Sequence, residues 1–153
     1  MSDDKSSPKS KKSLDDIDDE YEEKLNKIRE DLDDSFQINQ RNLDTEVMKT
    51  ISKLHYYNSI LSEEKLQLKK IIRKKNEIYG KLYEKYRFNY DMKLDKGEIS
   101  HWIERNPLWQ KINNYYESHK ELCDFIERTL KSFQNKSFAI KNLIDLKRIE
   151  LGM

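Results

Sequence analysis

The feature that most constrains the fold of this chain is a stretch of about fifty residues with no proline and one glycine. It runs from Asp44, the expected N-cap of a helix, to about Met92, and its glycine is Gly80. Apolar residues recur in it at spacings of three, four and seven: Leu54, Tyr57, Leu61, Leu68, Ile71, Ile78, Leu82 and Tyr86. This pattern is typical of a helix with one packed face. The stretch therefore predicts one helix of roughly 70 Å, with Gly80 as the candidate position for a kink.

The residues that precede this stretch divide by composition into an extension and an acidic arm. Residues 1–13 contain no apolar residue after Met1, so they cannot offset the entropy of ordering and are expected to be disordered. Residues 14–34 carry eleven acidic residues against three basic ones, a net charge of −8. Their apolar residues are spaced by three and four, which predicts a thin amphipathic helix. A loop over residues 36–42 then leads to the long helix.

The C-terminal part is predicted to contain three further helical segments. A short helix over residues 98–104 should stop at Asn106, because the residue before a proline disfavours the helical conformation. Pro107 then suits the first position of the next helix. We predict a break at residues 135–137 and a last amphipathic helix that stops at Gly152.

The composition agrees with an all-α protein. Charged residues make up 39% of the chain and hydrophobic residues 35%. Three glycines are too few for the turns of a sheet of several strands. The predicted fold is a long-helix antiparallel helical hairpin or bundle. Because so polar a chain buries little apolar surface, we expect residues 35–153 to form a domain that self-associates through helix faces.

The sequence gives no indication of secretion or of a membrane segment. The single cysteine, Cys123, excludes an intramolecular disulfide and fits a reducing compartment. No segment approaches the roughly 20 consecutive apolar residues that span a bilayer, and the N-terminus lacks the apolar core of a signal peptide. We therefore expect a soluble, intracellular protein.

Positive charge is concentrated in residues 65–87. This segment has nine basic residues against two acidic ones, a net charge of +7 in a chain whose total is +1. It predicts a helix with one packed face and one strongly positive face suited to contact with a polyanion. The alternative is a solvated lysine face, although such surfaces usually carry more interspersed glutamates. The residues assigned to nucleic-acid contact are Lys69, Lys70, Arg73, Lys74, Lys75, Lys81, Lys85 and Arg87.

Two further patterns accompany the basic segment. Tyrosines recur at spacings of four, three and four, as Tyr79, Tyr83, Tyr86 and Tyr90. Such rings stack on bases in single-strand binders, but packing is the favoured interpretation for most of them. Residues 128–148 form a second basic cluster with a net charge of +5. This cluster would merge with the first one if it lay beside it, or it would bind an acidic protein or the acidic arm.

No pattern in the sequence indicates catalysis, a cofactor or a metal. Glycine-rich nucleotide-binding motifs, the HExxH motif and paired cysteines are absent. His119 falls on an apolar stripe, so a packed imidazole is favoured over a metal ligand or a base. Cys123 is expected to be a small buried hydrophobe, and Trp102 and Trp109 are expected to be core or interface aromatics.

Three segments of the chain carry a family resemblance. The run LCDFIERTLKSFQNKSFAIKNLIDLKRIELG covers residues 122–152, and NSILSEEKLQLKKI and KLYEKYRFNYDMKLD lie upstream in that order. They resemble the UvsY family of phage recombination mediators, which ends in an LDF-type helix and an [RN]-x-F-x-IK-x-x-I-D segment. The likeness covers about Asp34 to Gly152, and residues 1 to about 20 lie outside it. Residues close to the C-terminal pattern are Asn135, Ser137, Phe138, Ile140, Lys141, Ile144 and Asp145.

The resemblance implies a non-enzymatic protein that binds single-stranded DNA in the cytoplasm of a bacterial host. It implies a ring-like homo-oligomer, a hexamer or heptamer, without a cofactor. It also implies a role in loading a RecA-like recombinase (UvsX) onto DNA occupied by the phage single-strand-binding protein. The candidate oligomerisation residues are Leu122, Ile126, Leu130, Phe138, Ile140 and Ile144.

At the level of residues, the resemblance points to the end of the basic segment. A Lys-x-Arg pair is associated with DNA contact in the family, and Lys85-Tyr86-Arg87 is its nearest match. The chain departs from the family pattern just beyond this pair, where Met92 replaces a glycine and the aromatic pair is reduced to Tyr90.

Two other functions fit the sequence. A coiled-coil scaffold with solvated lysines explains the apolar stripes and the polarity equally well. A regulator that reads duplex DNA is less favoured, because no helix-turn-helix spacing is present. For the acidic arm, we hypothesise that its charge of −8 either covers the basic segment in the absence of DNA or holds a partner protein.

Overall fold

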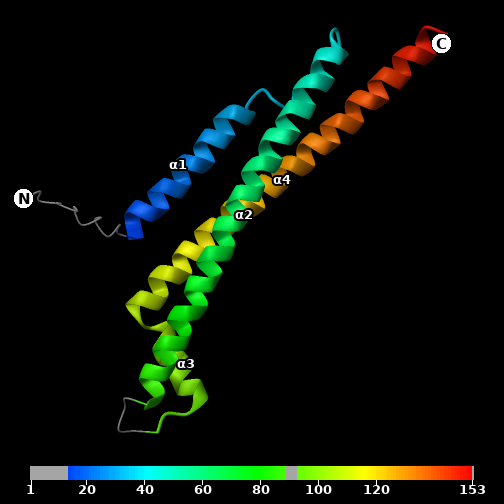
Figure 1. The fold of residues 1–153 in the computed structure, drawn as a ribbon. Coiled ribbons are helices and arrows are strands. Elements are labelled where there is room, and N and C mark those ends of the chain that lie inside the picture. Colours follow the sequence, from blue (N-terminus) through cyan, green and yellow to red (C-terminus); the bar gives the residue numbers. More distant parts are fainter. Residues whose placement is uncertain (1–13, 89–92, 153) are drawn as a thin grey trace, which may run out of the picture.

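The computed structural model describes residues 14–88 and 93–152, and its regular elements there are all helices. In chain order they are α1 (Leu14–Leu32), α2 (Leu43–Phe88), α3 (Lys96–Glu104) and α4 (Pro107–Glu150). The helices α2 and α4 form one elongated antiparallel hairpin, α3 lies at its closed end, and α1 lies along its side (Figure 1). The predicted all-α class and hairpin are thus confirmed. The extension 1–13, Tyr90 and Met92 lie outside the described residues.

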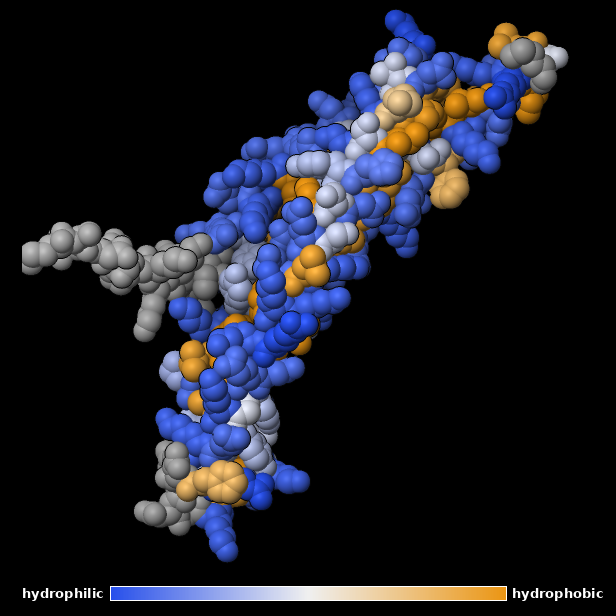
Figure 2. Space-filling model, viewed as in Figure 1, coloured by the Kyte–Doolittle hydropathy of each residue, from blue (hydrophilic) through white to orange (hydrophobic). Residues whose placement is uncertain are grey.

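Two clusters of buried side chains hold the hairpin together. The first lies where α1, α2 and α4 meet, and Tyr57, Ile126 and Phe133 are almost fully buried there. The rings of Tyr57 and Phe133 stack with centroids 5.8 Å apart. The second cluster lies at the closed end, where Ile99 and Ile103 of α3 pack against α2. Hydrophilic side chains cover most of the face in Figure 2, although apolar side chains such as Phe138 and Ile149 of α4 are also exposed.

The long helix α2 begins two residues earlier than the sequence suggested. Its cap is Asn42 rather than Asp44, because the side-chain oxygen of Asn42 accepts a hydrogen bond from the backbone N–H of Thr45 at 3.3 Å. Leu43, the first helical residue, is buried, and this packing favours the earlier start. Asp44 instead adds negative charge to the first turn, where it interacts favourably with the helix dipole.

The starts of α3 and α4 are fixed by side-chain caps. Asp95 and Glu98 form a capping box, with both hydrogen bonds at 2.9 Å. Asn106 caps α4 by accepting a hydrogen bond from the backbone N–H of Leu108 at 2.9 Å, and Pro107 occupies the first turn as predicted. At the other end, Gly152 has a φ of 70°, so the predicted stop is confirmed.

The predicted break at residues 135–137 is wrong, because α4 is continuous through them. Phe133, Lys136 and Ile140 are all buried on the face that α4 presents to α2. The ammonium group of Lys136 lies 2.9 Å from the carboxylate of Glu46 on α2. These tertiary contacts outweigh the weak helix preference of the asparagine and serine at this point.

A buried polar relay joins the three longest helices. The Tyr21 hydroxyl of α1 is hydrogen-bonded to Nδ1 of His119 on α4, and Nε2 of His119 lies 2.8 Å from the backbone carbonyl oxygen of Glu64 on α2. Because a carbonyl only accepts, Nε2 carries a proton, and the Glu64 carboxylate lies 3.1 Å from the same nitrogen. Burial raises the pKa of Tyr21, so its hydroxyl remains a donor. His119 is therefore the packed imidazole that its position predicted.

Replacing Tyr21 with phenylalanine tests the relay. The variant lacks the hydroxyl that is hydrogen-bonded to Nδ1 of His119, so this buried nitrogen has no partner. The free energy of unfolding is expected to fall by about 1–2 kcal/mol. Urea denaturation followed by circular dichroism measures the change. Tyr56→Phe on exposed α2 surface is the control, and equal stability of both variants would show that the relay contributes nothing.

Candidate nucleic-acid interface

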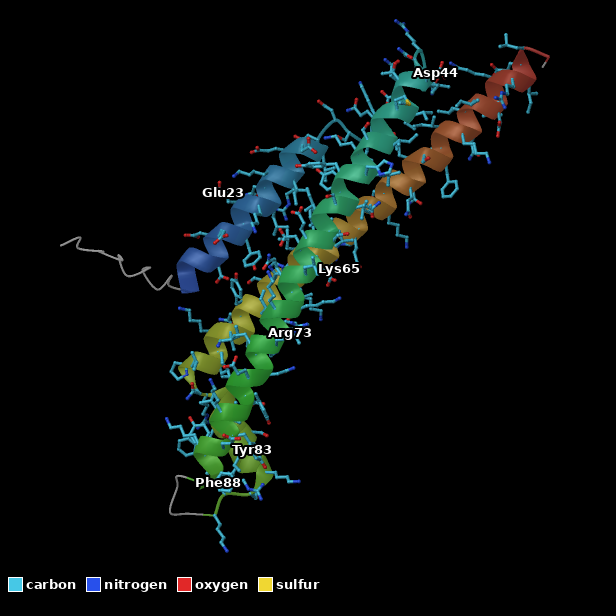
Figure 3. The ribbon with its side chains drawn as sticks, viewed as in Figure 1. Glu23, Asp44, Lys65, Arg73, Tyr83 and Phe88 are labelled. Atoms are coloured by element: carbon cyan, nitrogen blue, oxygen red, sulfur yellow. The ribbon has the colours of Figure 1, made fainter. Side chains whose placement is uncertain are left out.

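A line of exposed cations follows the side of α2 opposite its packed face. Ile71, Ile78 and Leu82 are buried toward the other helices, and the cations lie on the remaining surface. We call this surface the outer basic face, and it consists of Lys69, Lys70, Arg73, Lys74, Lys81, Lys85 and Arg87. It covers about 27 Å of the helix axis. Figure 3 labels Arg73 within it and Phe88 at its end.

Most of these cations are free to accept an external anion. Five of them form no ion pair within the described residues, namely Lys69, Lys70, Arg73, Lys85 and Arg87. Glu77 lies 3.2 Å from the ammonium group of Lys74 and 2.7 Å from that of Lys81. The hydrogen bond to Lys81 lowers the pKa of Glu77, and the same bond raises the pKa of Lys81. Because such exposed pairs contribute little to stability, a phosphate can replace Glu77 at small cost.

Lys75 is the one candidate cation that the structure places away from this face. Its ammonium group lies 4.1 Å from the ring centroid of Tyr116 and 5.3 Å from that of Trp109, both on α4. The side chain is half-buried between the two helices. Lys75 therefore holds α2 to α4 through cation–π contacts within this subunit.

The recurring tyrosines of α2 mainly pack against other side chains of the same chain. Tyr86 is buried in the second cluster, and its hydroxyl accepts a hydrogen bond from Asn106 at 2.9 Å. Tyr79 and Tyr83 stack on each other with centroids 6.4 Å apart, and Tyr79 meets Trp109 edge to face. These three rings therefore contribute to the closed end of the hairpin.

Comparison with protein families identifies the family to which this chain belongs. The model of the family described as "Recombination, repair and ssDNA binding protein UvsY" matches residues 31–153, well over half of the chain. The chain belongs to the UvsY family. No curated protein and no solved structure was found to match it.

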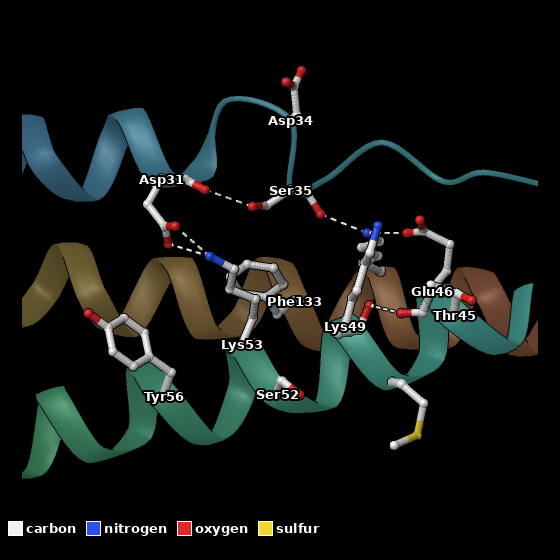
Figure 4. Close-up of a pocket in the computed structure, with 13 residues that line it drawn as sticks. Asp31, Asp34, Ser35, Thr45, Glu46, Lys49, Ser52, Lys53, Tyr56 and Phe133 are labelled. Carbon is white, nitrogen blue, oxygen red and sulfur yellow. Dashed lines mark hydrogen bonds and ion pairs between the residues drawn. The ribbon is translucent and has the colours of Figure 1, made fainter. Parts of the chain in front are cut away.

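The helix α1 lies almost entirely before the segment that matches the UvsY family. It packs against α4 and is joined to the N-terminal half of α2 by the Asp31 carboxylate, which accepts a hydrogen bond from Lys53 at 2.5 Å (Figure 4). The same carboxylate accepts a hydrogen bond from the Tyr57 hydroxyl at 2.6 Å. These two bonds lower the pKa of Asp31. The described residues of α1 leave most of the basic segment exposed, and its covering by the acidic arm stays a hypothesis. Glu20 of α1 reaches the start of the segment, because it lines a cavity of about 480 Å³ together with Lys70 and Lys74.

The second basic cluster does not merge with the outer basic face in this UvsY-family subunit. Because α4 runs antiparallel to α2, residues 128–148 lie beside the start of α2 rather than its end. Lys136 of this cluster is buried against Glu46, and Lys147 donates to the backbone carbonyl of Gln40 at 2.5 Å. The cluster and the face therefore occupy opposite halves of the hairpin.

The candidate oligomerisation residues divide into buried and exposed positions. Leu122, Ile126, Leu130 and Ile140 are buried within the subunit, where they pack α4 against its neighbours. Ile144 is half-buried. Phe138 is 67% exposed. Leu146 and Ile149, which lie beyond it, are also exposed and share its side of α4.

The described part of the chain shows no arrangement suited to metal binding. No group of three or more His, Cys, Asp or Glu side chains within residues 14–88 and 93–152 is placed to hold an ion. Cys123 is buried, as predicted, and burial raises the pKa of its thiol. Over the same residues, none of the helices is both long enough and apolar enough to cross a membrane.

Proposed function

We propose that this UvsY-family protein is a non-enzymatic recombination mediator that binds single-stranded DNA through the outer basic face. The proposal depends on one observation, namely a row of exposed cations, most of them without carboxylate partners, on a helix inside the family match. The mediator promotes loading of a RecA-like recombinase of the UvsX type onto DNA covered by single-strand-binding protein.

The chemistry of the face suits the phosphate backbone. Lysine and arginine that neutralise phosphates release condensed counterions, which drives binding independently of base sequence. A strand held in this way is withdrawn from the single-strand-binding protein that covered it. Binding energy per cation is small because each side chain is exposed.

Several copies of the face are needed for a tight grip. A homo-oligomer presents the faces together, so that each further contact forms at high effective concentration. The exposed apolar side of α4 supports this step, since Phe138, Leu146 and Ile149 are exposed to 67%, 56% and 73%. A ring of six or seven subunits, the assembly implied by the family resemblance, would bury such residues.

Comparing oligo-dT with duplex DNA of equal length tests the proposal. We expect preference for the single strand and an affinity that falls steeply with salt, by about 0.7 in log K per unit of log salt concentration for each phosphate contact. Fluorescence anisotropy at several sodium chloride concentrations measures both.

Each other outcome favours a different function. Absence of binding to either DNA would leave the scaffold with solvated lysines as the better description. Equal binding to both would favour a reader of duplex DNA.

A further inference from the structure

The most exposed aromatic side chain of the described residues lies at the end of the outer basic face. Phe88 closes α2 and is 73% exposed, more than Phe138, Tyr56 or Trp102. It belongs to neither buried cluster. Figure 3 places it at the lower tip of the helix. The ring therefore contributes little to the stability of the subunit itself.

The surroundings of this ring are cationic. The Arg87 guanidinium carbon lies 5.8 Å from the Phe88 ring centroid and 5.9 Å from that of Tyr83. The same guanidinium donates a hydrogen bond to the Tyr83 hydroxyl at 3.0 Å, which fixes its position between the two rings. Lys85 and Lys81 precede Phe88 by three and seven residues, so they lie on its side of the helix.

This combination suits one kind of ligand. We infer that Phe88 is a base-stacking position, on which an unpaired nucleobase stacks while Arg87 and Lys85 hold the adjacent phosphates. Single-strand binders pair a positive groove with aromatic rings in this way, because every base has a π face. The inference rests on the proposed function and adds to it a contact with the base itself.

A protein segment fits the site less well than a base. An apolar partner helix would cover Phe88 together with its neighbours on the exposed side of α2, and these are Glu84, Lys85 and Arg87. Covering them would remove charges from water without a compensating partner. A nucleotide, in contrast, brings a flat apolar base and an anionic phosphate to the same place.

Phe88 is better placed for stacking than the recurring tyrosines of α2. Packing was the favoured interpretation for most of these tyrosines, and Tyr86 is buried while Tyr79 packs against Trp109. Phe88, four residues after Glu84, is 73% exposed.

The experiment separates stacking from phosphate contact. Full-length wild type, Phe88→Leu and Phe88→Trp are titrated with oligo-dT and with a strand of equal length made only of abasic deoxyribose phosphates. Leucine keeps the apolar bulk but removes the π face. We expect Phe88→Leu to weaken oligo-dT binding at least about fivefold and Phe88→Trp to retain it. Neither variant should change binding to the abasic strand.

The outcomes distinguish the two proposals. Tyr56→Ala, an exposed aromatic on the same helix and about 48 Å away, is the control and should bind both strands as wild type does. If wild type binds neither strand, the proposed function fails. If wild type binds both strands and Phe88→Leu leaves both affinities unchanged or lowers them equally, stacking is overturned and phosphate contact stands. A smaller oligomer for Phe88→Leu in sedimentation would overturn stacking in favour of a subunit contact.

Discussion

Replacing Lys69, Lys70, Arg73 and Lys85 together with glutamine is expected to weaken oligo-dT binding on the order of 100-fold at low salt. None of the four forms an ion pair within the described residues, so the replacement breaks no internal ion pair there. The slope of log K against log salt concentration should become shallower by about 0.7 for each phosphate contact removed. Anisotropy titrations across a range of sodium chloride concentrations give both quantities.

A second set of four cations provides the matched control. Lys120, Arg128, Lys131 and Lys141 are exposed on α4, and their replacement with glutamine changes the net charge equally. We expect the control variant to lose less than about threefold in affinity, because only long-range attraction is reduced. Equal losses in both variants would show that net charge, rather than the outer basic face, determines binding. An unaffected outer-face variant would remove the assignment of the site.

The long helices were predictable because their signals are local and repeated. The absence of proline and the apolar stripe predicted that α2 is one long helix. The Asn106-Pro107 pair predicted where α4 begins. The continuity of α4 was not predictable, since residues 135–137 have a weak local preference. What holds them helical is the burial of Lys136 against Glu46, a contact between residues ninety positions apart.

Helical register explains where the structure places the residues of the candidate interface. Seven of the eight assigned cations are exposed on α2, as a charge count alone suggests. Lys75 is the exception, and its register reveals the reason: it lies four residues after Ile71 and three before Ile78, both buried. A stripe also cannot tell a contact within a subunit from one between subunits. Leu122 and Ile126 are buried inside the hairpin, and their assignment to oligomerisation stays a prediction.

Replacing Lys136 with methionine is expected to destabilise the fold by about 3 kcal/mol at neutral pH. The Lys136 ammonium group contacts the Glu46 carboxylate at 2.9 Å and the backbone carbonyl of Ser35 at 2.7 Å, so it ties α4 to α2 and to the α1–α2 loop (Figure 4). The two side chains are only 6% and 9% exposed. Methionine leaves the carboxylate buried without its cation. The expected loss of stability is at the lower end of the range for a broken buried ion pair, because Glu46 also lines a cavity of about 750 Å³ that water can enter.

Urea denaturation of three variants isolates the pair. Lys141→Met removes an exposed cation from the same helix and should change stability by less than about 0.5 kcal/mol. The double variant Glu46→Leu with Lys136→Met should recover most of the loss, since two apolar side chains leave no charge unpaired. If Lys136→Met is as stable as Lys141→Met, the ion pair does not hold α4 to α2.

The pH dependence of the same variants identifies the carboxylate as the cause. The hydrogen bond from Lys136 lowers the pKa of folded Glu46 below its ordinary value of 4.5. The pair therefore stabilises the fold above that ordinary value, and the contribution disappears as pH falls through the lowered pKa. The difference between wild type and Lys136→Met should accordingly be largest near pH 7 and shrink toward about pH 3. A difference that stays constant over this interval would mean that lost packing of the lysine stem, rather than the unpaired carboxylate, destabilises the variant.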